Sequence, residues 1–266
     1  MCTIVALHGV RSDFPLVLAT NRDEFFARPS AGPMRILEQP VTVGGRDLKA
    51  LGTWMGVTRE GLFVGVTNQR TLRAPDPSKR SRGELVVHAL ERENARAIRG
   101  LLAGLDGRDF NSFNLMFGRA GDLFAAYGRD DQREIEVEPV PRGVHVLPND
   151  RLDSSDFWKV GRAKEVLAGL TDMESLAWDE LAQRLIGLLS DGTPAPLSVL
   201  PELPPDAPFD RPTLQLLSAV CVRTPAYGTR SSTIVALTPD SVGHYLFADG
   251  PPDQTAFRDV KDLFGT

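Results

Sequence analysis

The chain has 266 residues, 42% of them hydrophobic, and a formal net charge of -5 at pH 7. This length and apolar content can build the core of one large domain, so we expect a single domain over residues 1–266. Acidic and basic residues are mixed along the sequence without a basic stripe, which argues against a nucleic-acid partner.

The sequence predicts neither a membrane span nor a signal peptide. Its longest apolar runs, such as 218–222 and 233–237, are far shorter than the roughly 20 residues that cross a bilayer. The first residues lack a positive region and a long apolar stretch, so we expect a cytoplasmic protein. Cys2 and Cys221 fit neither a disulfide framework nor a zinc motif, and we expect two free thiols and no bound metal.

The predicted strands are short and separated by turn residues. Residues 3–8 and 16–20 form two β-type runs joined by a polar turn around Ser12, which indicates a hairpin. Further β-type runs are 62–67, 113–117, 123–127, 144–147, 217–222, 233–237 and 243–247. Many neighbouring runs are one turn apart, which favours antiparallel pairing.

Helical periodicity is concentrated in three stretches. They are residues 83–105 with a break near Asn94, residues 154–170 and residues 174–189. The second stretch can be capped by Asp153, Ser154 or Ser155, and the third by Thr171 or Asp172. Helices between hairpin-like groups predict an α+β fold in which helices cover antiparallel sheets.

Residues 193–212 hold seven of the 20 prolines. The prolines are too many for a helix and leave too few amides for a central strand, so we expect an extended surface segment. It is either a plain connector or a rigid flap over a binding cleft.

Cys2 directly follows the initiator methionine, and its small side chain allows that methionine to be removed. The thiol would then share a residue with a free α-amine, which titrates at about 7.7 to 8.0 and can take the thiol proton near neutral pH. One residue would thus supply both nucleophile and base. A buried strand cysteine is also a common inert apolar side chain, which is the alternative here.

The run Asn21-Arg22-Asp23-Glu24 follows the second predicted strand, where its side chains could face the start of the first strand. A nearby arginine favours the thiolate, and a carboxylate could hold the α-amine. Arg22, Asp23 and Glu24 are therefore candidate catalytic residues, and Asn21 is a candidate substrate ligand. The alternative is an ordinary solvated turn.

Glycine-rich segments at 44–47 and 51–56 precede a predicted strand that ends at Asn68. The glycines allow tight turns and close backbone approach. The Asn68 amide can donate to a developing oxyanion, which makes it a candidate catalytic residue. Candidate substrate-binding residues around these segments are Arg46, Trp54 and Arg70. Trp54 could instead belong to the core.

Two later polar residues also adjoin predicted strands. Asn149 follows the strand at 144–147 and is either a turn residue or a second amide donor. Arg230 precedes the strand at 233–237 and could anchor a carboxylate or stabilise negative charge. Its alternative role is that of an ordinary surface arginine.

Together these segments resemble the Asn-Arg-Asp-Glu family, which includes the eukaryotic transport and Golgi organisation proteins. The resemblance is carried by Cys2, Asn21-Arg22-Asp23-Glu24, Gly44-Gly45-Arg46-Asp47, Gly52-Thr53-Trp54-Met55-Gly56, Leu147-Pro148-Asn149 and Gly228-Thr229-Arg230-Ser231-Ser232. These motifs span nearly the whole chain. The family resemblance implies a four-layer αββα sandwich of two mainly antiparallel sheets, as in N-terminal-nucleophile hydrolases.

A more distant similarity links the sequence to the bile-salt hydrolase and penicillin-V acylase branch of that fold. It implies that Cys2 is the nucleophile, that Asn68 and Asn149 serve the oxyanion and substrate, and that Arg230 completes the pocket. That branch has an early Arg-x-x-Asp pair, whereas Phe25 follows Arg22 by three residues here. Either Asn21 and Glu24 take the two positions, or Arg22 and Asp23 do so after a register shift.

We therefore expect a cysteine N-terminal-nucleophile hydrolase or acyl transferase that acts on a small amide or (thio)ester. The alternative, implied by family members proposed to carry haem or to influence acyl-lipid handling, is a non-enzymatic carrier that uses the same cleft. No resident cofactor is expected, and haem would be a carried ligand. Its iron could be bound by Cys2, His8, His88, His145 or His244. A third possibility is a scaffold without chemistry.

Overall fold

The computed structural model describes residues 2–169 and 173–265. Its strands are β1 (Cys2–His8), β2 (Leu16–Phe25), β3 (Ser30–Glu38), β4 (Val41–Asp47), β5 (Met55–Thr58), β6 (Phe63–Asn68), β7 (Phe113–Arg119), β8 (Asp122–Gly128), β9 (Glu136–Pro139), β10 (Gly143–Leu147), β11 (Tyr227–Leu237), β12 (Val242–Ala248) and β13 (Arg258–Asp259). Its helices are α1 (Arg82–Leu90), α2 (Ala95–Ala103), α3 (Trp158–Ala168), α4 (Trp178–Leu189) and α5 (Arg211–Leu217), with short 3-10 turns η1 (Gly107–Asp109), η2 (Leu197–Val199) and η3 (Lys261–Phe264).

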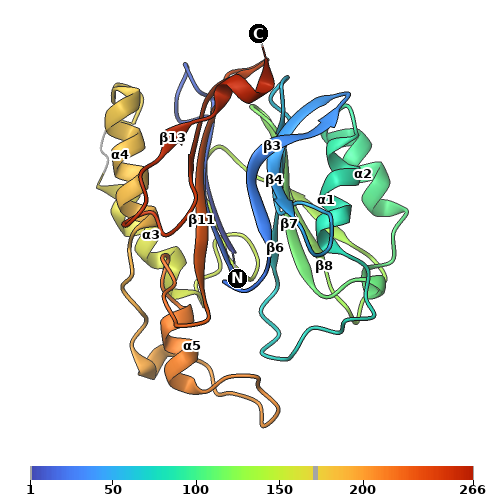
Figure 1. The fold of residues 1–266 in the computed structure, drawn as a ribbon, viewed down its shortest axis with the longest axis vertical. Coiled ribbons are helices and arrows are strands. Elements are labelled where there is room, and N and C mark those ends of the chain that lie inside the picture. Colours follow the sequence, from blue (N-terminus) through green and yellow to red (C-terminus); the bar gives the residue numbers. More distant parts are fainter. Residues whose placement is uncertain (1, 170–172, 266) are drawn as a thin grey trace.

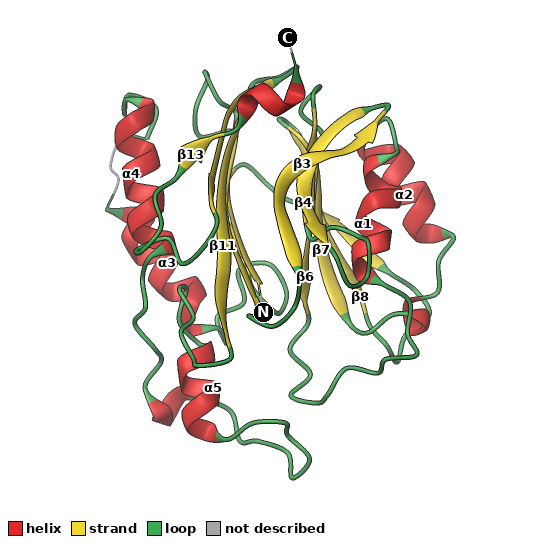
Figure 2. Cartoon of the chain, viewed as in Figure 1, coloured by secondary structure: helices red, strands yellow, loops and turns green. Residues whose placement is uncertain are grey.

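The strands form two antiparallel sheets that pack face to face (Figures 1 and 2). One has six strands in the order β10-β1-β2-β11-β12-β13, and the other has seven in the order β3-β4-β5-β6-β7-β8-β9. Helices α3 and α4 cover the outer face of the first sheet, and α1 and α2 cover the outer face of the second. This arrangement confirms the predicted four-layer αββα sandwich.

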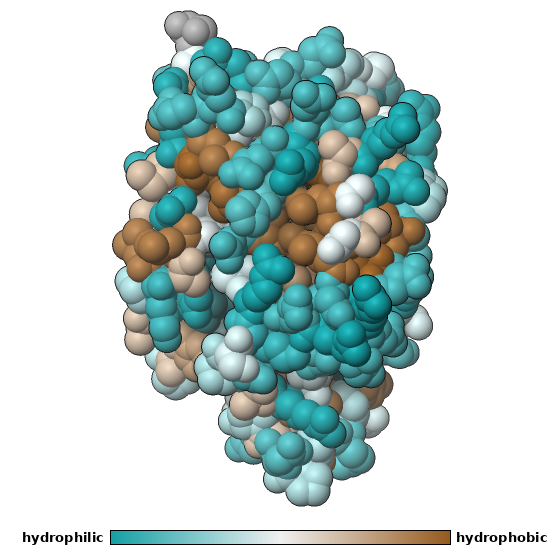
Figure 3. Space-filling view, turned by 90° about the vertical axis from the view of Figure 1, so that its right-hand side faces the viewer, coloured by the Kyte–Doolittle hydropathy of each residue, from teal (hydrophilic) through white to brown (hydrophobic). Residues whose placement is uncertain are grey.

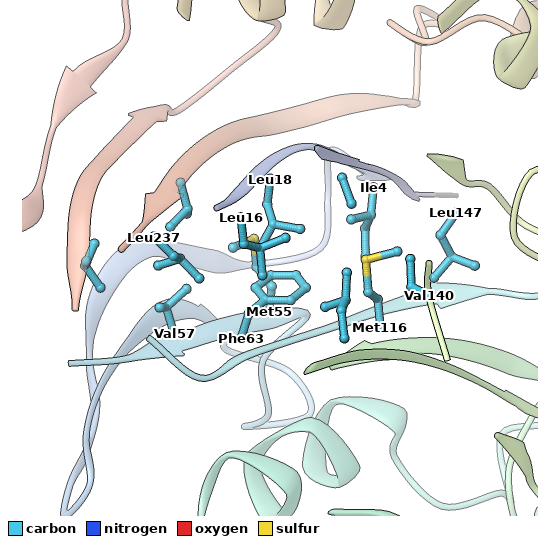
Figure 4. Close-up of a cluster of buried hydrophobic side chains, with 14 of the residues drawn as sticks. Ile4, Leu16, Leu18, Met55, Val57, Phe63, Met116, Val140, Leu147 and Leu237 are labelled. Atoms are coloured by element: carbon cyan, nitrogen blue, oxygen red, sulfur yellow. The ribbon is translucent and has the colours of Figure 1, made fainter. Parts of the chain in front are cut away.

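The core between the sheets depends on the alternation of side chains along each strand. Ile4 and Leu18 on one sheet meet Met55, Phe63 and Met116 on the other, and all five side chains are buried (Figure 4). The opposite faces of β1 and β2 carry a second set of apolar residues that contacts α3 and α4. Each sheet is therefore covered on both faces.

The helix between residues 83 and 105 is broken where the sequence predicts. Asn94 caps α2 with its side-chain oxygen, which accepts a hydrogen bond from the Ala97 amide at 3.0 Å. Ser81 caps α1 in the same way through Glu84 at 3.3 Å. The side-chain oxygens satisfy amides that have no partner within the first turn of a helix.

Several predicted boundaries are wrong. Residues 217–222 do not form a strand, because α5 ends at Leu217 and the apolar residues after it are buried in an irregular segment. Helices α3 and α4 each begin four residues after the predicted start, and neither has a side-chain cap, so Asp153, Ser154 and Ser155 do not cap α3. Thr171 and Asp172 lie outside the described residues.

The proline-rich segment is largely irregular, as predicted, but it contains η2 and leads into α5. Helix α5 can begin there because Pro212 occupies its first turn, where a missing amide hydrogen costs nothing. The glycine-rich stretches at 44–47 and 51–56 contribute to β4 and β5, which the sequence analysis did not identify as strands.

Asn21 connects the six-stranded sheet to its helical layer. Its Nδ2 donates to the carbonyl oxygens of Leu189 at 2.8 Å and Val220 at 2.9 Å. Its Oδ1 accepts a hydrogen bond from the Ser232 hydroxyl at 2.6 Å. The residue is 1% exposed, so these bonds satisfy polar groups that water does not reach.

No helix within the described residues is long and apolar enough to cross a bilayer. The side of the molecule that carries α1 and α2 is mostly hydrophilic, with apolar areas between the polar side chains (Figure 3). Ile36, Leu101 and Phe124 are among the partly buried apolar residues that pack against the core beneath these helices.

Replacing Asn21 tests its connecting role. We expect Asn21→Ala to lower the free energy of unfolding by about 2–4 kcal/mol, because two buried carbonyl oxygens lose their donor and each unsatisfied group costs about 1–3 kcal/mol. Urea denaturation followed by circular dichroism measures the loss. The matched control is Asn94→Ala, which removes a helix cap and should cost about 1 kcal/mol. A smaller loss at Asn21 than at Asn94 would contradict this role.

Candidate active site

The pairing of β1 with β2 sets the geometry of the site. Strand β2 continues to Phe25, so Asn21 to Glu24 lie within the strand and not beyond its end. Cys2 pairs with Arg22, and Thr3 pairs with Asn21. Because side chains alternate along a strand, Arg22 shares the inter-sheet face with Cys2, while Asn21 and Asp23 point toward the helical layer.

Cys2 lines a cleft of about 430 Å³ at the end of the sandwich where β1 begins. The cleft is bounded by the end of β2, the loop from β4 to β5, the end of β6 and the segment before α1. The predicted site residues that line it are Cys2, Arg22, Asp23, Glu24, Trp54 and Asn68. Six of the eleven predicted residues therefore meet at one cleft.

Cys2 is half-buried as a residue and lines the cleft together with charged side chains. Burial raises its pKa, although a hydrogen bond from the Asp23 backbone amide and the positive charge of Arg22 act in the opposite direction. Arg82, at the start of α1, is also close enough to interact electrostatically with the Cys2 thiolate. With a raised pKa the thiol stays protonated near neutral pH, so a nucleophilic role requires a base.

Arg22 is held against Trp54, with its guanidinium carbon 4.1 Å from the centre of the indole ring. Its Nη1 also donates to the Ser30 hydroxyl at 3.3 Å. Burial lowers the pKa of Arg22, which the nearby Cys2 thiolate opposes. Trp54 thus both packs against the core and orients a cation beside the thiol.

An ion-pair network forms the outer wall of the cleft. Arg28 Nε donates to Asp47 Oδ2 at 2.7 Å and lies 3.8 Å from Glu24 Oε2. Asp47 also accepts hydrogen bonds from the amides of Lys49 and Ala50, both at 2.9 Å. These bonds fix the turn between β4 and β5, which carries Trp54 toward Cys2.

Asp23 is buried behind Cys2. Its Oδ1 accepts a hydrogen bond from the Thr229 hydroxyl at 2.7 Å, and its Oδ2 lies 4.0 Å from Lys159 Nζ. Its backbone oxygen accepts a bond from the Tyr227 hydroxyl at 2.8 Å. Burial raises the pKa of Asp23 and lowers that of Lys159, and the attraction between the two charges opposes both shifts.

The two predicted asparagines are neighbours. Asn149 Nδ2 donates to the Asn68 backbone oxygen at 2.7 Å, and the Arg70 amide donates to the Asn149 backbone oxygen at 2.8 Å. Asn68 lines the Cys2 cleft, whereas Asn149 and Arg70 line a separate cavity beside α3. Asn149 therefore positions the end of β6 in addition to any direct role.

Three predicted residues line neither cavity. The Asn21 amide is fully used in the sheet-to-helix contacts described above. Arg46 lies in β4, opposite Ala31 of β3. Arg230 occupies the irregular step in the pairing of β11 with β2, between Thr229 and Ser231.

The four histidines lie away from the cleft. His8 contacts the backbone oxygens of Val140 and Pro141, and His145 contacts Asp153 at 2.7 Å. The His88 ring lies 3.3 Å from the Glu91 carboxylate, and the His244 ring stacks on Trp178 at 4.5 Å. Of the candidate haem ligands, Cys2 alone lines the cleft that the structure describes. Haem binding remains a prediction.

Sequence reasoning missed Arg82, Lys159 and Thr229 as members of the site. Each comes from an element distant in sequence from Cys2. Arg82 interacts electrostatically with the Cys2 thiolate, and Lys159 and Thr229 contact the Asp23 carboxylate. Thr229 lies in one of the motifs that carried the resemblance, which was a usable signal. Nothing in the local sequence marks Lys159 as buried.

Solved structures with this architecture include two hydrolases. A C2A variant of conjugated bile acid hydrolase from Clostridium perfringens matches with a TM-score of 0.53 and 15% identity over 100% of this chain and 95% of that one. The Caenorhabditis elegans orthologue of N-acylethanolamine-hydrolyzing acid amidase matches with a TM-score of 0.55 and 11% identity over 88% and 92% of the two chains. At these identities the likeness establishes an N-terminal-nucleophile hydrolase fold.

Sequence comparison gives the family. The cattle (Bos taurus) transport and Golgi organization protein 2 homolog is 30% identical over 250 residues, which cover 90% of this chain and 87% of that protein. The human homolog is 30% identical over 254 residues, with the same coverage. The family model for transport and Golgi organisation 2 matches residues 1–248. The chain therefore belongs to the transport and Golgi organisation 2 family.

Proposed function

We propose that this protein is a cysteine N-terminal-nucleophile hydrolase or acyl transferase that acts on a small amide or (thio)ester. The observation that carries the proposal is the position of Cys2. It begins a strand at the edge of a polar cleft, directly opposite Arg22, whose positive charge favours the thiolate. An inert core cysteine would lie on an apolar face instead.

The pairing of β1 with β2 also supports the α-amine of Cys2 as the catalytic base. Strand β1 runs antiparallel to β2, and Cys2 pairs with Arg22. The chain on the N-terminal side of Cys2, which begins at its backbone nitrogen, therefore runs alongside Asp23, the next residue of β2. After removal of Met1 this nitrogen becomes an α-amine beside a buried carboxylate, which can orient it. The amine titrates near the pH of the cell and can accept the proton of a thiol whose own pKa is raised.

The same register favours one of the two assignments left open by the sequence. Arg22 and Asp23 flank Cys2, whereas Asn21 is occupied by contacts to Leu189 and Val220. Glu24 lies farther out beside Arg28. We therefore assign Arg22 and Asp23 as the charged pair that assists the Cys2 nucleophile. Glu24 belongs to the wall of the cleft.

In the proposed reaction the α-amine takes the thiol proton, and the sulfur bonds to the acyl carbon. The resulting oxyanion is stabilised by the Asn68 amide and by the charges of Arg22 and Arg82. Collapse breaks the bond to the leaving group, which receives the proton from the α-ammonium. Water or another nucleophile then attacks the thioester, releases the acyl group and restores the thiol.

The solved structures named above are hydrolases of conjugated bile acids and of N-acylethanolamines, both of which contain an amide. Their likeness to this chain is one of fold, so the proposal of acyl-transfer chemistry rests on the residues around Cys2 and names no particular acyl group. We also propose the cytoplasm as the compartment, because a reducing environment keeps Cys2 a free thiol.

Acylation of Cys2 tests the nucleophile. Intact mass spectrometry should show that the mature protein lacks Met1 and gains one acyl group when it is treated with amide, thioester or lactone panels. Cys2→Ala should gain none, whereas Cys221→Ala should react as wild type does, because Cys221 is 1% exposed and lies outside the cleft. A mature protein that keeps Met1 would rule out the α-amine as base.

Replacing Asn68 tests the oxyanion contact. We expect Asn68→Ala to slow acylation by about 100- to 1000-fold, the usual effect of losing one oxyanion donor. The matched control is Asn111→Ala, since Asn111 lines the same cleft but its Nδ2 donates to the Asp76 backbone oxygen at 2.8 Å. The control should change the rate only slightly. Equal losses at both positions would contradict the role of Asn68.

The pH dependence of acylation tests the base. In the mature protein the rate should rise with an apparent pKa near 8, the ordinary range of an α-amine. In protein that retains Met1, prepared with the aminopeptidase inhibited, the rate should rise only at higher pH, because burial raises the pKa of the Cys2 thiol. Identical profiles for the two forms would exclude the amine.

A further inference from the structure

A second cavity of about 310 Å³ lies between the start of α3, the proline-rich segment and α5. None of the residues that line it lines the Cys2 cleft. In Figure 1, α5 lies below α3 at the lower end of the six-stranded sheet. The proline-rich segment thus covers a cavity, but not the cleft that contains Cys2.

One wall of this cavity is apolar. It is formed by Ala195, Val199, Leu200, Leu214 and Leu217. Several of these side chains belong to a small hydrophobic cluster, separate from the three main cores, that includes Leu72 and Trp158. The wall can accept an aliphatic chain, and Val199 marks the mouth because it is 58% exposed.

The opposite wall contains a buried cation. The Lys159 side chain is 2% exposed, and its Nζ makes no hydrogen bond to any residue that the structure describes. Its nearest carboxylate oxygen, Asp23 Oδ2, is 4.0 Å away, which is longer than a hydrogen bond. A buried ammonium without an acceptor is costly, so this wall favours a ligand that supplies one.

Three further groups complete the polar end of the cavity. The Arg70 guanidinium lies 4.0 Å above the Phe157 ring and lines the cavity. Helix α3 begins here, and its N-cap residue Phe157 makes no side-chain capping bond, so the positive end of the helix dipole faces the same region. Asn149 is 0% exposed, and its Oδ1 has no hydrogen-bond partner among the described residues, so it can accept from a ligand or a water.

The charges favour a monoanion. Asp156 also lines the cavity but is exposed, and both Asp156 and Asp150 interact electrostatically with Arg70. These carboxylates, together with Asp23 beside Lys159, offset much of the positive charge. A carboxylate matches the remainder better than a dianionic phosphate does.

We propose that this cavity binds an amphiphilic carboxylate, with the charged group against Lys159 and Arg70 and the aliphatic chain along the wall formed by α5 and the proline-rich segment. Binding at this site does not require the Cys2 thiol, which lines the other cavity. It assigns the proline-rich segment a function as the cover of a binding site.

Isothermal titration calorimetry with decanoate tests the proposal on the full chain. We expect saturable binding that is equal in wild type and Cys2→Ala, and at least tenfold weaker in Lys159→Met. Decanol, which lacks the charge, should bind at least tenfold more weakly. Absence of binding by decanoate, or equal binding by decanol, would overturn the proposal, and tighter binding of decyl phosphate would overturn the choice of a carboxylate.

A matched pair of surface variants keeps the test decisive if Lys159→Met does not fold. Val199→Asp places a negative charge at the mouth and should weaken decanoate binding at least tenfold. Leu197→Asp makes the same change at a residue of η2 that is 46% exposed and does not line the cavity, so it should bind as wild type does. Unchanged binding in Val199→Asp, or equal losses in both variants, would refute this location.

Discussion

The antiparallel pairing of β1 with β2 is the constraint on which the site depends. This register places Cys2 opposite Arg22 and turns Asp23 toward the helical layer. A shift of one residue would exchange the two faces, burying the arginine under α3 and directing Asp23 at the inter-sheet core. The apolar residues of the same strands oppose such a shift, because Ile4 and Leu18 must meet the second sheet. Packing of the core therefore fixes the positions of Cys2, Arg22 and Asp23 in the candidate active site.

A buried pair of opposite charges, Asp23 and Lys159, lies between the two cavities. Asp23 and Lys159 are both almost fully buried and lie 4.0 Å apart, so each makes the burial of the other less costly. This pair separates two cavities, since Asp23 lines the Cys2 cleft and Lys159 lines the cavity under the proline-rich segment. A ligand that draws Lys159 away from Asp23 would alter the charge behind Cys2. The two sites thus share one electrostatic element.

The segment from Asn68 to Arg70 links the same two cavities through the backbone. Asn68 lines the cleft, Arg70 lines the second cavity, and Asn149 binds the backbone of both residues. Thr67 adds to this connection by donating to the Pro148 oxygen at 2.7 Å. These contacts hold the end of β6 and the loop after β10 together as one wall between the cavities.

The sequence alone determined the family, the layered fold and six of the residues that line the cleft, because contiguous motifs such as residues 21–24 and strand-length apolar runs are local signals. It even located the helix break at Asn94, whose side chain caps α2 without help from distant residues. Tertiary structure decided which of these polar residues meet. Asn21 became a connector because α4 and the buried segment after α5 present two carbonyl oxygens to it. Lys159 became a site residue only because α3 packs on the sheet behind Asp23, a contact between residues far apart in sequence.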